Sequence, residues 1–331
     1  KLWHKRGEGA GSGSLKRGLG IGVCTWGGAG HACTSRLNIH PDGTVEVEMA
    51  TQDLGTGTRT VMAQVAAETL GLPAGAIKIK IGDSAYPPGG TSGGSTTVGG
   101  VSSSTRKAAV NALEKLYEAV APSLNAKPEE LVAADGKIMV KGQPAKALAW
   151  KAACQKLGVN SISEQAANVP AQAAKEGLNT GGVGGVQIAD VSVDIETGIV
   201  RMNRLVAVQD CGTIINPKTA ESQVYGACIM SICGALMEER IMDAVTGKML
   251  NADMEFYKLA GIGDIGEIIA HLEIDEANDA RGVIGLGEPP AVGGIAAIAN
   301  AVTNAIGVRP PLIPMTPMNV LNALADKGRI S

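Results

Sequence analysis

One glutamate stands in a segment that is unusually rich in glycine and proline. The ten residues from Gly285 to Gly294 read Gly-Leu-Gly-Glu-Pro-Pro-Ala-Val-Gly-Gly. Glycines allow backbone torsions closed to other residues and let other groups approach closely. We expect Pro289 to hold Glu288 in an extended conformation, just before the buried helix that the apolar run 295–306 predicts. A rigidly held carboxylate at the mouth of a buried helix could act as a general base. A solvated turn residue is the alternative, because glutamate is seldom buried.

Two further glycine-rich segments, 52–58 and 89–97, also lie between a predicted strand and a predicted helix. Backbone N–H groups in such loops, together with a helix N-terminus, can bind phosphate or another anion. Neither segment matches the phosphate loop that ends in Gly-Lys-Ser/Thr, nor the dinucleotide fingerprint, so a nucleoside triphosphate and NAD are not indicated. Each loop alone could be a simple turn. Three of them at strand-to-helix junctions favour a shared ligand.

A fourth candidate lies in the helix that Asn216-Pro217 begins and that runs to about Glu239. Gln223 belongs to this helix, and small residues follow it at Gly226, Ala227, Ser231 and Gly234. A face of small residues lets a flat ligand or another backbone come near. Tight packing against a second helix explains the same pattern.

The remaining elements must position these loops. Alternating apolar and polar residues predict a hairpin at 36–49 and strands at 77–81, 191–195 and 200–208. Hairpins followed by helices indicate an α+β fold of two mixed αβ lobes rather than one parallel sheet. The division predicted from these patterns is an exposed lead-in at 1–18, a first lobe at 19–121, a connecting excursion at 122–185 and a second lobe at 186–331, which carries Glu288.

Composition narrows the class of protein. The chain has 331 residues, of which 45 % are hydrophobic and only 2 % aromatic, so an aliphatic core is expected. A net charge of −3 gives no support to nucleic-acid binding. The sequence contains no segment of the length and purity of a membrane span. It lacks an initiator methionine, so we expect a processed, truncated or partial chain.

The six cysteines form no C-x-x-C pair, so we expect neither a zinc site nor an iron–sulfur cluster within this chain. Burial as small hydrophobes, or a reducing compartment, accounts for them. The localisation predicted is cytoplasmic, with the periplasm as the alternative for a folded complex.

Taken in order, four motifs identify a family. They are Gln-Asp-Leu-Gly-Thr-Gly-Thr at 52–58, Thr-Ser-Gly-Gly-Ser-Thr-Thr at 91–97, the set Asp-Cys-Gly, Ile-Asn-Pro and Ser-Gln-Val-Tyr-Gly between 210 and 226, and Gly-Leu-Gly-Glu-Pro-Pro at 285–290. Together they closely resemble the molybdenum-binding subunit of the xanthine dehydrogenase/aldehyde oxidoreductase (molybdenum hydroxylase) family. The resemblance runs from about Arg17 onwards and matches the C-terminal half of that subunit, the second molybdopterin-binding domain.

The resemblance implies a role for each motif. Glu288 corresponds to the base that takes the proton from the Mo–OH group. The oxygen then attacks a carbon of an aldehyde or N-heterocycle, and hydride passes to the sulfido ligand. Trp26 corresponds to an aromatic substrate contact, and no residue of this chain is implied as a metal ligand. The residues implied in molybdopterin binding are Asp53, Leu54, Gly55, Thr56, Gly57, Gly93, Gly94, Ser95, Thr96, Thr97, Gln223 and Gly287.

Two departures from the family pattern accompany these implications. Thr56 stands where some members carry glutamine, which implies a backbone contact there rather than a side-chain contact. The Gly-Gly-Ser form of the 91–97 loop resembles the bacterial aldehyde-oxidising branch more than the purine-oxidising branch.

The resemblance also implies partners. The family's first molybdopterin-binding half, its 2Fe-2S module and its FAD module have no counterpart in this sequence, so all three are expected on partner chains or segments. The cofactor is molybdenum-molybdopterin, with the cytosine dinucleotide form as one option, and the substrate is a small molecule. Two alternatives stay open: a non-catalytic assembly or interaction subunit, and a related reaction such as reductive dehydroxylation. Carbon monoxide oxidation is disfavoured, because that branch usually carries its metal-bridging cysteine on the absent half.

Overall fold

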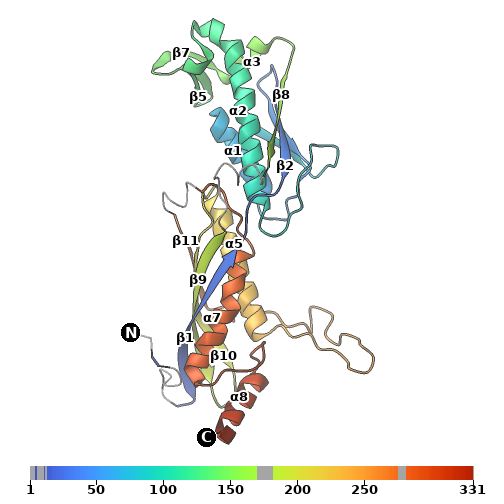
Figure 1. Cartoon of the computed structure of the whole chain (residues 1–331), viewed down its shortest axis with the longest axis vertical. Helices are drawn as coiled ribbons and strands as arrows, with labels where there is room; N and C mark the ends of the chain where they lie inside the picture. Colours follow the sequence, from blue (N-terminus) through green and yellow to red (C-terminus); the bar gives the residue numbers. More distant parts are fainter. Residues whose placement is uncertain (1–3, 6–10, 12, 170–181, 275–280, 331) are drawn as a thin grey trace.

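The chain folds into two αβ lobes that lie end to end along the long axis of the molecule (Figure 1). The structure is a computed structural model of the chain, and it describes residues 4–5, 11, 13–169, 182–274 and 281–330. Each lobe has its own apolar core. The predicted α+β class of two mixed αβ lobes is confirmed.

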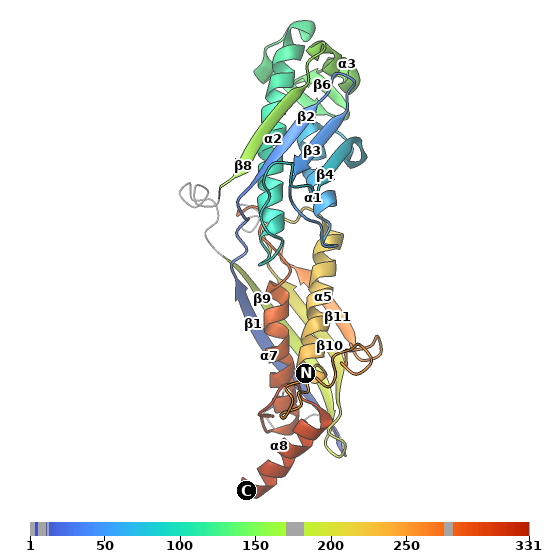
Figure 2. The same cartoon turned by 90° about the vertical axis from the view of Figure 1, so that its right-hand side faces the viewer.

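The first lobe is built on a four-stranded sheet with the order β4-β3-β2-β8 (Figure 2). These strands span Ile77–Ile81, Val45–Met49, Cys33–Ile39 and Ile162–Asn168. Helices α1 (Thr58–Leu70) and α2 (Thr97–Leu124) pack on one another and on this sheet. The smaller elements at the far end are β5, β6, β7 and α3, which span Leu131–Ala134, Lys137–Val140, Gln143–Ala149 and Trp150–Cys154. Short 3₁₀ turns lie at Ala74–Ala76, Pro128–Glu130 and Gln155–Leu157.

The second lobe contains a four-stranded sheet with the order β1-β9-β10-β11. Its strands span Leu15–Trp26, Val183–Asp194, Val200–Gln209 and Glu267–Leu272. Helices α5 (Pro217–Leu236) and α7 (Pro289–Ile306) pack against this sheet, and α8 (Pro317–Ile330) follows. Within the described part of the chain, none of these helices has the length and apolar character needed to cross a bilayer.

The lobes differ in their boundaries from the division that the sequence patterns indicate. All of β1 pairs antiparallel with β9, so residues 19–26 lie in the second lobe's sheet rather than the first. Strand β8, from the predicted excursion, pairs antiparallel with β2 and so belongs to the first lobe. Both pairings join residues more than a hundred positions apart, which no local pattern reveals. Much of the predicted lead-in and residues 170–181 of the excursion lie outside the described residues.

Strand β1 and helix α7 approach so closely that only glycine fits between them. Gly18, Gly20 and Gly22 share one face of β1, and a Cβ on any of them would fall within 3.0 Å of the α7 backbone. Opposite them α7 presents small residues at intervals of four: Gly293, Ala297, Ala301 and Ala305. This packing fixes where the N-terminus of α7, and therefore Glu288, lies.

We predict that Gly20→Ala destabilises the protein by about 1–3 kcal/mol, the usual cost of overpacking a well-packed interior. The added Cβ would meet backbone atoms of Ala297 and Ala301, which cannot rotate away. Denaturant unfolding of the variant measures the change. Gly184→Ala is the matched control, because a Cβ there would meet only Cys24 O at 4.0 Å. Equal stability of the two variants would contradict the close packing.

Candidate functional site

A cavity of about 690 Å³ lies where the two lobes meet. It is lined by the loop before α1, the loop before α2, the first turns of α5 and the segment that leads into α7. The structure therefore brings all four sequence motifs to one place. The predicted site residues that line the cavity are Leu54, Thr56, Gly93, Ser95, Thr97, Gln223, Gly287 and Glu288.

The first turns of four helices contribute to the lining of this cavity. Residues of the first turns of α1, α2, α5 and α7 all line it, among them Thr58, Thr97, Thr219 and Ala291. A helix N-terminus carries a partial positive charge and favours an anion by about 0.3–1 kcal/mol at an exposed site. None of these four helices, as described, has an acidic residue in its first turn. The cavity is therefore suited to an anionic ligand without any lysine or arginine in its lining.

The side chain of Asp53 organises its own loop. Its Oδ1 accepts hydrogen bonds from the N–H groups of Gly55 at 3.0 Å and Gly57 at 3.1 Å, and its Oδ2 accepts from Arg59 N at 3.1 Å. Burial opposes ionisation, but these donors outweigh it and hold the pKa of Asp53 below its usual value. Asp53, Gly55 and Gly57 thus shape the turn, while Leu54 and Thr56 face the cavity.

Glu288 is the N-cap of α7 and has helical torsions, with φ −67° and ψ −37°. The expectation of an extended conformation is therefore wrong. Pro289 and Pro290 occupy the first positions of the helix, where their missing N–H groups are not needed and their fixed φ suits the helix. Ala291 N donates to Glu288 O at 2.9 Å and closes the first turn.

The carboxylate of Glu288 is held by the loop that precedes α2. Gly94 N donates to Oε1 at 2.9 Å, and Ser95 Oγ donates to Oε2. In return, Glu288 N donates to Ser95 Oγ at 2.9 Å. One serine hydroxyl therefore fixes both the backbone and the side chain of Glu288. Sequence reasoning placed Ser95 among the cofactor contacts and missed this role, because the two residues are 193 positions apart.

The loop that holds Glu288 has an uncommon backbone. Ser95 has φ 56° and Gly94 has φ 67°, the left-handed region that few residues other than glycine adopt. Ser95 O also lies so close to Gly285 that a Cβ at position 285 could not be accommodated. Gly287 lies against the same serine, since a Cβ there would be 3.1 Å from Ser95 Oγ. The glycines of the Glu288 segment are thus needed for the contact between the lobes.

Trp26 supports this loop from its outer side. Its Nε1 donates to Gly94 O at 3.0 Å, so the ring is fixed beside the residue that holds Glu288. Trp26 itself lines a second, shallower hollow at the end of β1 and β9 rather than the main cavity. Gly94 and Thr96 also lie next to the main cavity rather than in its lining. Thr96 O accepts from His31 N at 3.1 Å.

His31 is a residue of this region that sequence reasoning did not single out. Its ring lies between Gly90 and Gly100, where a Cβ on either glycine would overlap it. His31 Nδ1 lies 3.3 Å from Thr91 O, at the start of the loop that carries Ser95. Burial lowers the pKa of His31 below 6.5, and the contact with Thr91 opposes this shift. The neutral ring is the form that the fold accommodates.

The Asp-Cys-Gly motif at 210–212 lies at the cavity, which Cys211 lines. Asp210 forms an ion pair with Arg281, and its Oδ1 accepts from Gly212 N at 2.9 Å. Burial, followed by the charge of Asp210, raises the pKa of Cys211 to about 11, so its thiol stays protonated at neutral pH. All six cysteines of the chain are buried and free. Within the described residues, no three His, Cys, Asp or Glu side chains are grouped to hold a metal ion.

Asn216 joins the two lobes across the cavity. Its Oδ1 accepts from Thr219 N at 3.1 Å and caps α5, while its Nδ2 donates to Gln64 Oε1 on α1 at 3.1 Å. The sequence identified Asn216-Pro217 as a helix start but gave no sign of the contact with Gln64. Gln223, about two turns further along α5, lies near the glutamate segment, since a Cβ on Gly287 would be 3.6 Å from Gln223 Oε1.

The molecule thus combines two αβ lobes with a cavity between them whose lining contains Glu288 and no lysine or arginine. Residues 2–266 match the family model of the molybdopterin cofactor-binding domain. The chain therefore belongs to the molybdopterin cofactor-binding family.

Relatives and solved structures agree with this assignment. The aldehyde oxidoreductase molybdenum-binding subunit PaoC of Escherichia coli (strain K12) is 36 % identical over 294 residues, which are 88 % of this chain and 38 % of that protein. The putative xanthine dehydrogenase molybdenum-binding subunit XdhA of the same strain is 30 % identical over 330 residues, 96 % of this chain and 43 % of that protein. Quinoline 2-oxidoreductase from Pseudomonas putida 86 matches with a TM-score of 0.83 and 25 % identity over 95 % of this chain and 42 % of that chain. The chain thus spans about two fifths of the length of these relatives.

We predict that acidification weakens the fold through His31. Because the folded-state pKa of His31 is lowered, the unfolded chain binds the extra proton first, and stability falls as the pH drops below 6.5. Melting temperatures measured on either side of this value, for the wild type and for His31→Gln, test the effect. The variant should lose less stability on acidification than the wild type. Parallel losses would show that His31 is not responsible.

Proposed function

We propose that this chain is the catalytic molybdenum-cofactor half of a multi-chain hydroxylase, with Glu288 as the general base. One observation carries the proposal: a carboxylate held by Gly94 and Ser95 lines the same cavity as the first turns of four helices. A base that serves a metal-activated oxygen must be near the metal without binding it. A carboxylate anchored by protein donors on both oxygens meets that condition.

The residues of the cavity suit the proposed cofactor. Molybdopterin carries a phosphate, and the first turn of α2, which has no side-chain cap, offers backbone N–H groups to it. Gln223 and Gly287 line the same cavity as Leu54 and Thr56, and Gln223 and Gly287 would contact the pterin. When bound, the molybdenum supplies the oxygen to be transferred and accepts the electrons. The task of the chain is to orient the cofactor and to take up the proton at Glu288.

The substrate class that we propose is an aldehyde or an N-heterocycle. The relatives include an aldehyde oxidoreductase subunit and a quinoline 2-oxidoreductase, which supports both options. We further propose that 2Fe-2S and FAD groups on partner chains carry the electrons away, and that the cofactor can be the cytosine dinucleotide form. Six free, buried cysteines are compatible with a cytoplasmic site of action, and the periplasm is the alternative.

We predict that Glu288→Gln lowers turnover by about 10²–10⁴-fold, the usual contribution of a general base. The amide keeps an acceptor for Gly94 N and a group that can bond Ser95 Oγ, so the loop and the bound molybdenum should be retained. Turnover of aromatic aldehydes and N-heterocycles with an artificial electron acceptor, together with the molybdenum content of the intact complex, measures the effect. Glu196→Gln, at the exposed β9–β10 turn, is the matched control.

Wild-type turnover in the Glu288→Gln complex would exclude Glu288 as the base. Molybdenum and pterin missing from the wild-type complex would favour a non-catalytic assembly subunit. A complex that holds the cofactor but oxidises none of these substrates would favour a related reaction, such as reductive dehydroxylation.

A further inference from the structure

Two polar side chains lie in the largely apolar layer between the second lobe's sheet and its helices. Gln187 on β9 is 1 % exposed, and Ser231 on α5 is 2 % exposed. The apolar core of this lobe includes Val224, Ala297 and Ile298 from the same two helices, α5 and α7. Burial of a polar group lowers stability unless the group is hydrogen-bonded. The bonds that these two side chains make therefore indicate why they are there.

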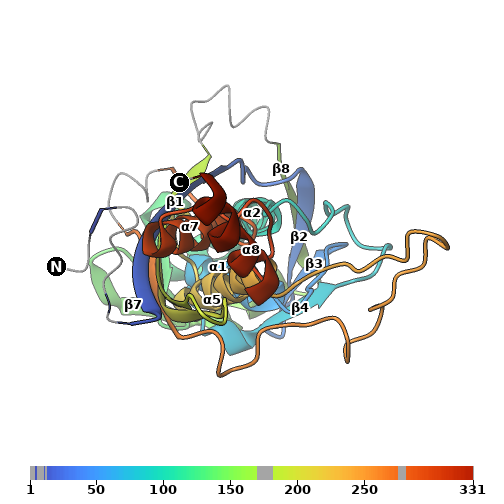
Figure 3. The same cartoon turned by 90° about the horizontal axis from the view of Figure 1, so that it is seen from below.

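Both side chains bond the first turn of α7. Gln187 Nε2 donates to Pro290 O. Ser231 Oγ donates to Ala291 O at 3.2 Å and shares its hydrogen with a carbonyl of its own helix at 3.0 Å. Seen from below, α5 and α7 lie beside one another with β1 at their flank (Figure 3). The sheet and the neighbouring helix thus both hold the turn that begins at Glu288.

A glycine on α7 makes room for the two side chains. A Cβ on Gly294 would fall within 3.0 Å of both Ser231 Oγ and Gln187 Oε1. Any other residue at this position would push the two polar side chains away from the helix backbone. Glycine also weakens the interior of a helix relative to alanine. The fold therefore has a helix-weakening residue where the polar contacts are made.

The stability of the core does not explain the amide of Gln187. Its Oε1 is buried and has no hydrogen-bond partner among the residues that the structure describes, which lowers stability. The neighbours of Gln187 across the sheet are Gly22 on β1 and Ala207 on β10, and neither is polar. A methionine of similar length would leave no polar atom unpaired in this layer, but it could not donate to Pro290 O.

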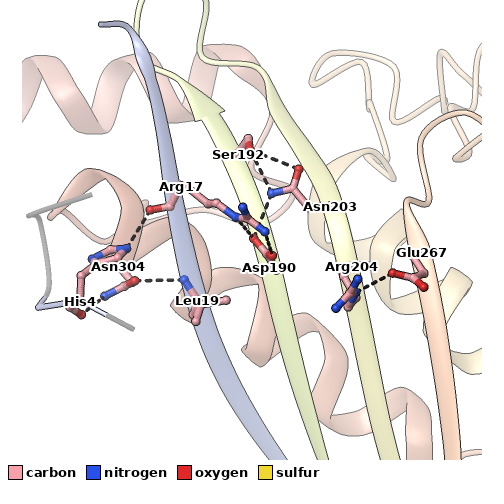
Figure 4. A network of polar contacts seen from close by, with 9 residues as sticks. All are labelled: His4, Arg17, Leu19, Asp190, Ser192, Asn203, Arg204, Glu267 and Asn304. Carbon is pink, nitrogen blue, oxygen red and sulfur yellow. Dashed lines mark hydrogen bonds and ion pairs between the residues drawn. The ribbon is translucent and has the colours of Figure 1, made fainter. Parts of the chain in front are cut away.

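The far end of α7 is held by a different polar residue (Figure 4). Asn304 Oδ1 accepts from Leu19 N on β1 at 3.0 Å, and its Nδ2 donates to His4 O at 3.2 Å. Asn304 is 8 % exposed, so it is buried and hydrogen-bonded as Gln187 is. It lies about 24 Å along the helix from Glu288 at the usual rise per residue. Asn304 is therefore a matched control for a contact that acts on the first turn of α7.

We propose that Gln187 and Ser231 are positioning residues for Glu288. They fix the first turn of α7 from within the second lobe, while Gly94 and Ser95 hold the carboxylate from the first lobe. The carboxylate is thus fixed on both sides of the cavity. The inference rests on the proposed function, in which Glu288 is the general base. A displacement of about 1 Å from the productive geometry can lower a rate by about 10²-fold.

Steady-state kinetics of the intact complex, purified from its host, test the proposal. We expect Gln187→Met to lower kcat for an aromatic aldehyde by about 10–10²-fold. KM and molybdenum content should stay at the wild-type level, because neither Gln187 nor Ser231 lines the cavity. Ser231→Ala should lower kcat less, because its hydroxyl is shared with a carbonyl of α5.

Asn304→Ala is the control, because it removes buried hydrogen bonds at the other end of the same helix. It should destabilise the protein but leave kcat at the wild-type level. Wild-type kcat in Gln187→Met would overturn the proposal. An equal fall of kcat in Asn304→Ala would overturn it as well, because any loosening of α7 would then have the same effect.

A double variant shows whether Gln187 acts through Glu288. Once the carboxylate is gone, the loss of its positioning residue has nothing further to remove. Gln187→Met combined with Glu288→Gln should therefore turn over at the rate of Glu288→Gln alone. A general disturbance of the structure would instead multiply the two losses, since independent effects add in free energy. Multiplied losses would overturn the positioning role.

Hydrogen–deuterium exchange gives a measurement that does not depend on turnover. A peptide covering residues 286–296 reports on the first turn of α7, which the bond from Ala291 N to Glu288 O closes. We expect this peptide to exchange faster in Gln187→Met than in the wild type, and to be unchanged in Asn304→Ala. Unchanged exchange in Gln187→Met would contradict the proposal.

The proposed function and the positioning role fail in different ways. If Glu288→Gln loses turnover and Gln187→Met does not, only the positioning role is wrong. If Glu288→Gln keeps turnover, the proposed function fails, and the exchange measurement still decides whether Gln187 holds the turn.

Discussion

The close contact between the glycine face of β1 and the small-residue face of α7 determines where Glu288 lies. The strand lies directly against the helix backbone at Gly18, Gly20 and Gly22, because glycine has no side chain. This close packing holds α7 in one position on the sheet. Because Glu288 caps α7, its position follows from this packing. Its carboxylate accepts hydrogen bonds from Gly94 N and Ser95 Oγ, which belong to the first lobe. The packing of β1 against α7 therefore also determines how Glu288 contacts the first lobe at the cavity.

The cavity can offer backbone amides and helix dipoles to an anion, and no lysine or arginine lines it. Each helix N-terminus contributes modestly, and the contributions of the four first turns that line the cavity add together. Such a site fixes a ligand's orientation through many directional donors. It also leaves Glu288 without a lysine or arginine in the cavity lining that would compete for its charge. A lining without basic side chains is thus compatible with both the proposed cofactor and the proposed role of Glu288 as a base.

Local sequence patterns predicted several elements but not the strands β1 and β8. The β2–β3 hairpin follows from alternation, and its register places Leu37 opposite Val47; α5 begins at Pro217 after its Asn216 cap, as the sequence predicted. Long-range relations could not be predicted, because nothing local records that β1 pairs with β9 or that Ser95 bonds Glu288. The torsions of Glu288 were predicted wrongly, since proline excludes helix interiors but suits the first helical turn. The order of the motifs indicated the family. The structure added the hydrogen bonds between Ser95 and Glu288, the contact of His31 with Thr91 O, and the hydrogen bond from Asn216 to Gln64.

The central claim is that the cavity between the lobes holds an anionic molybdenum-pterin cofactor beside Glu288. Quantifying molybdenum and molybdopterin in the intact complex, purified from its host under mild conditions, tests this most directly. The account predicts both in amounts equimolar with this chain. A complex that is fully assembled and contains neither would contradict it.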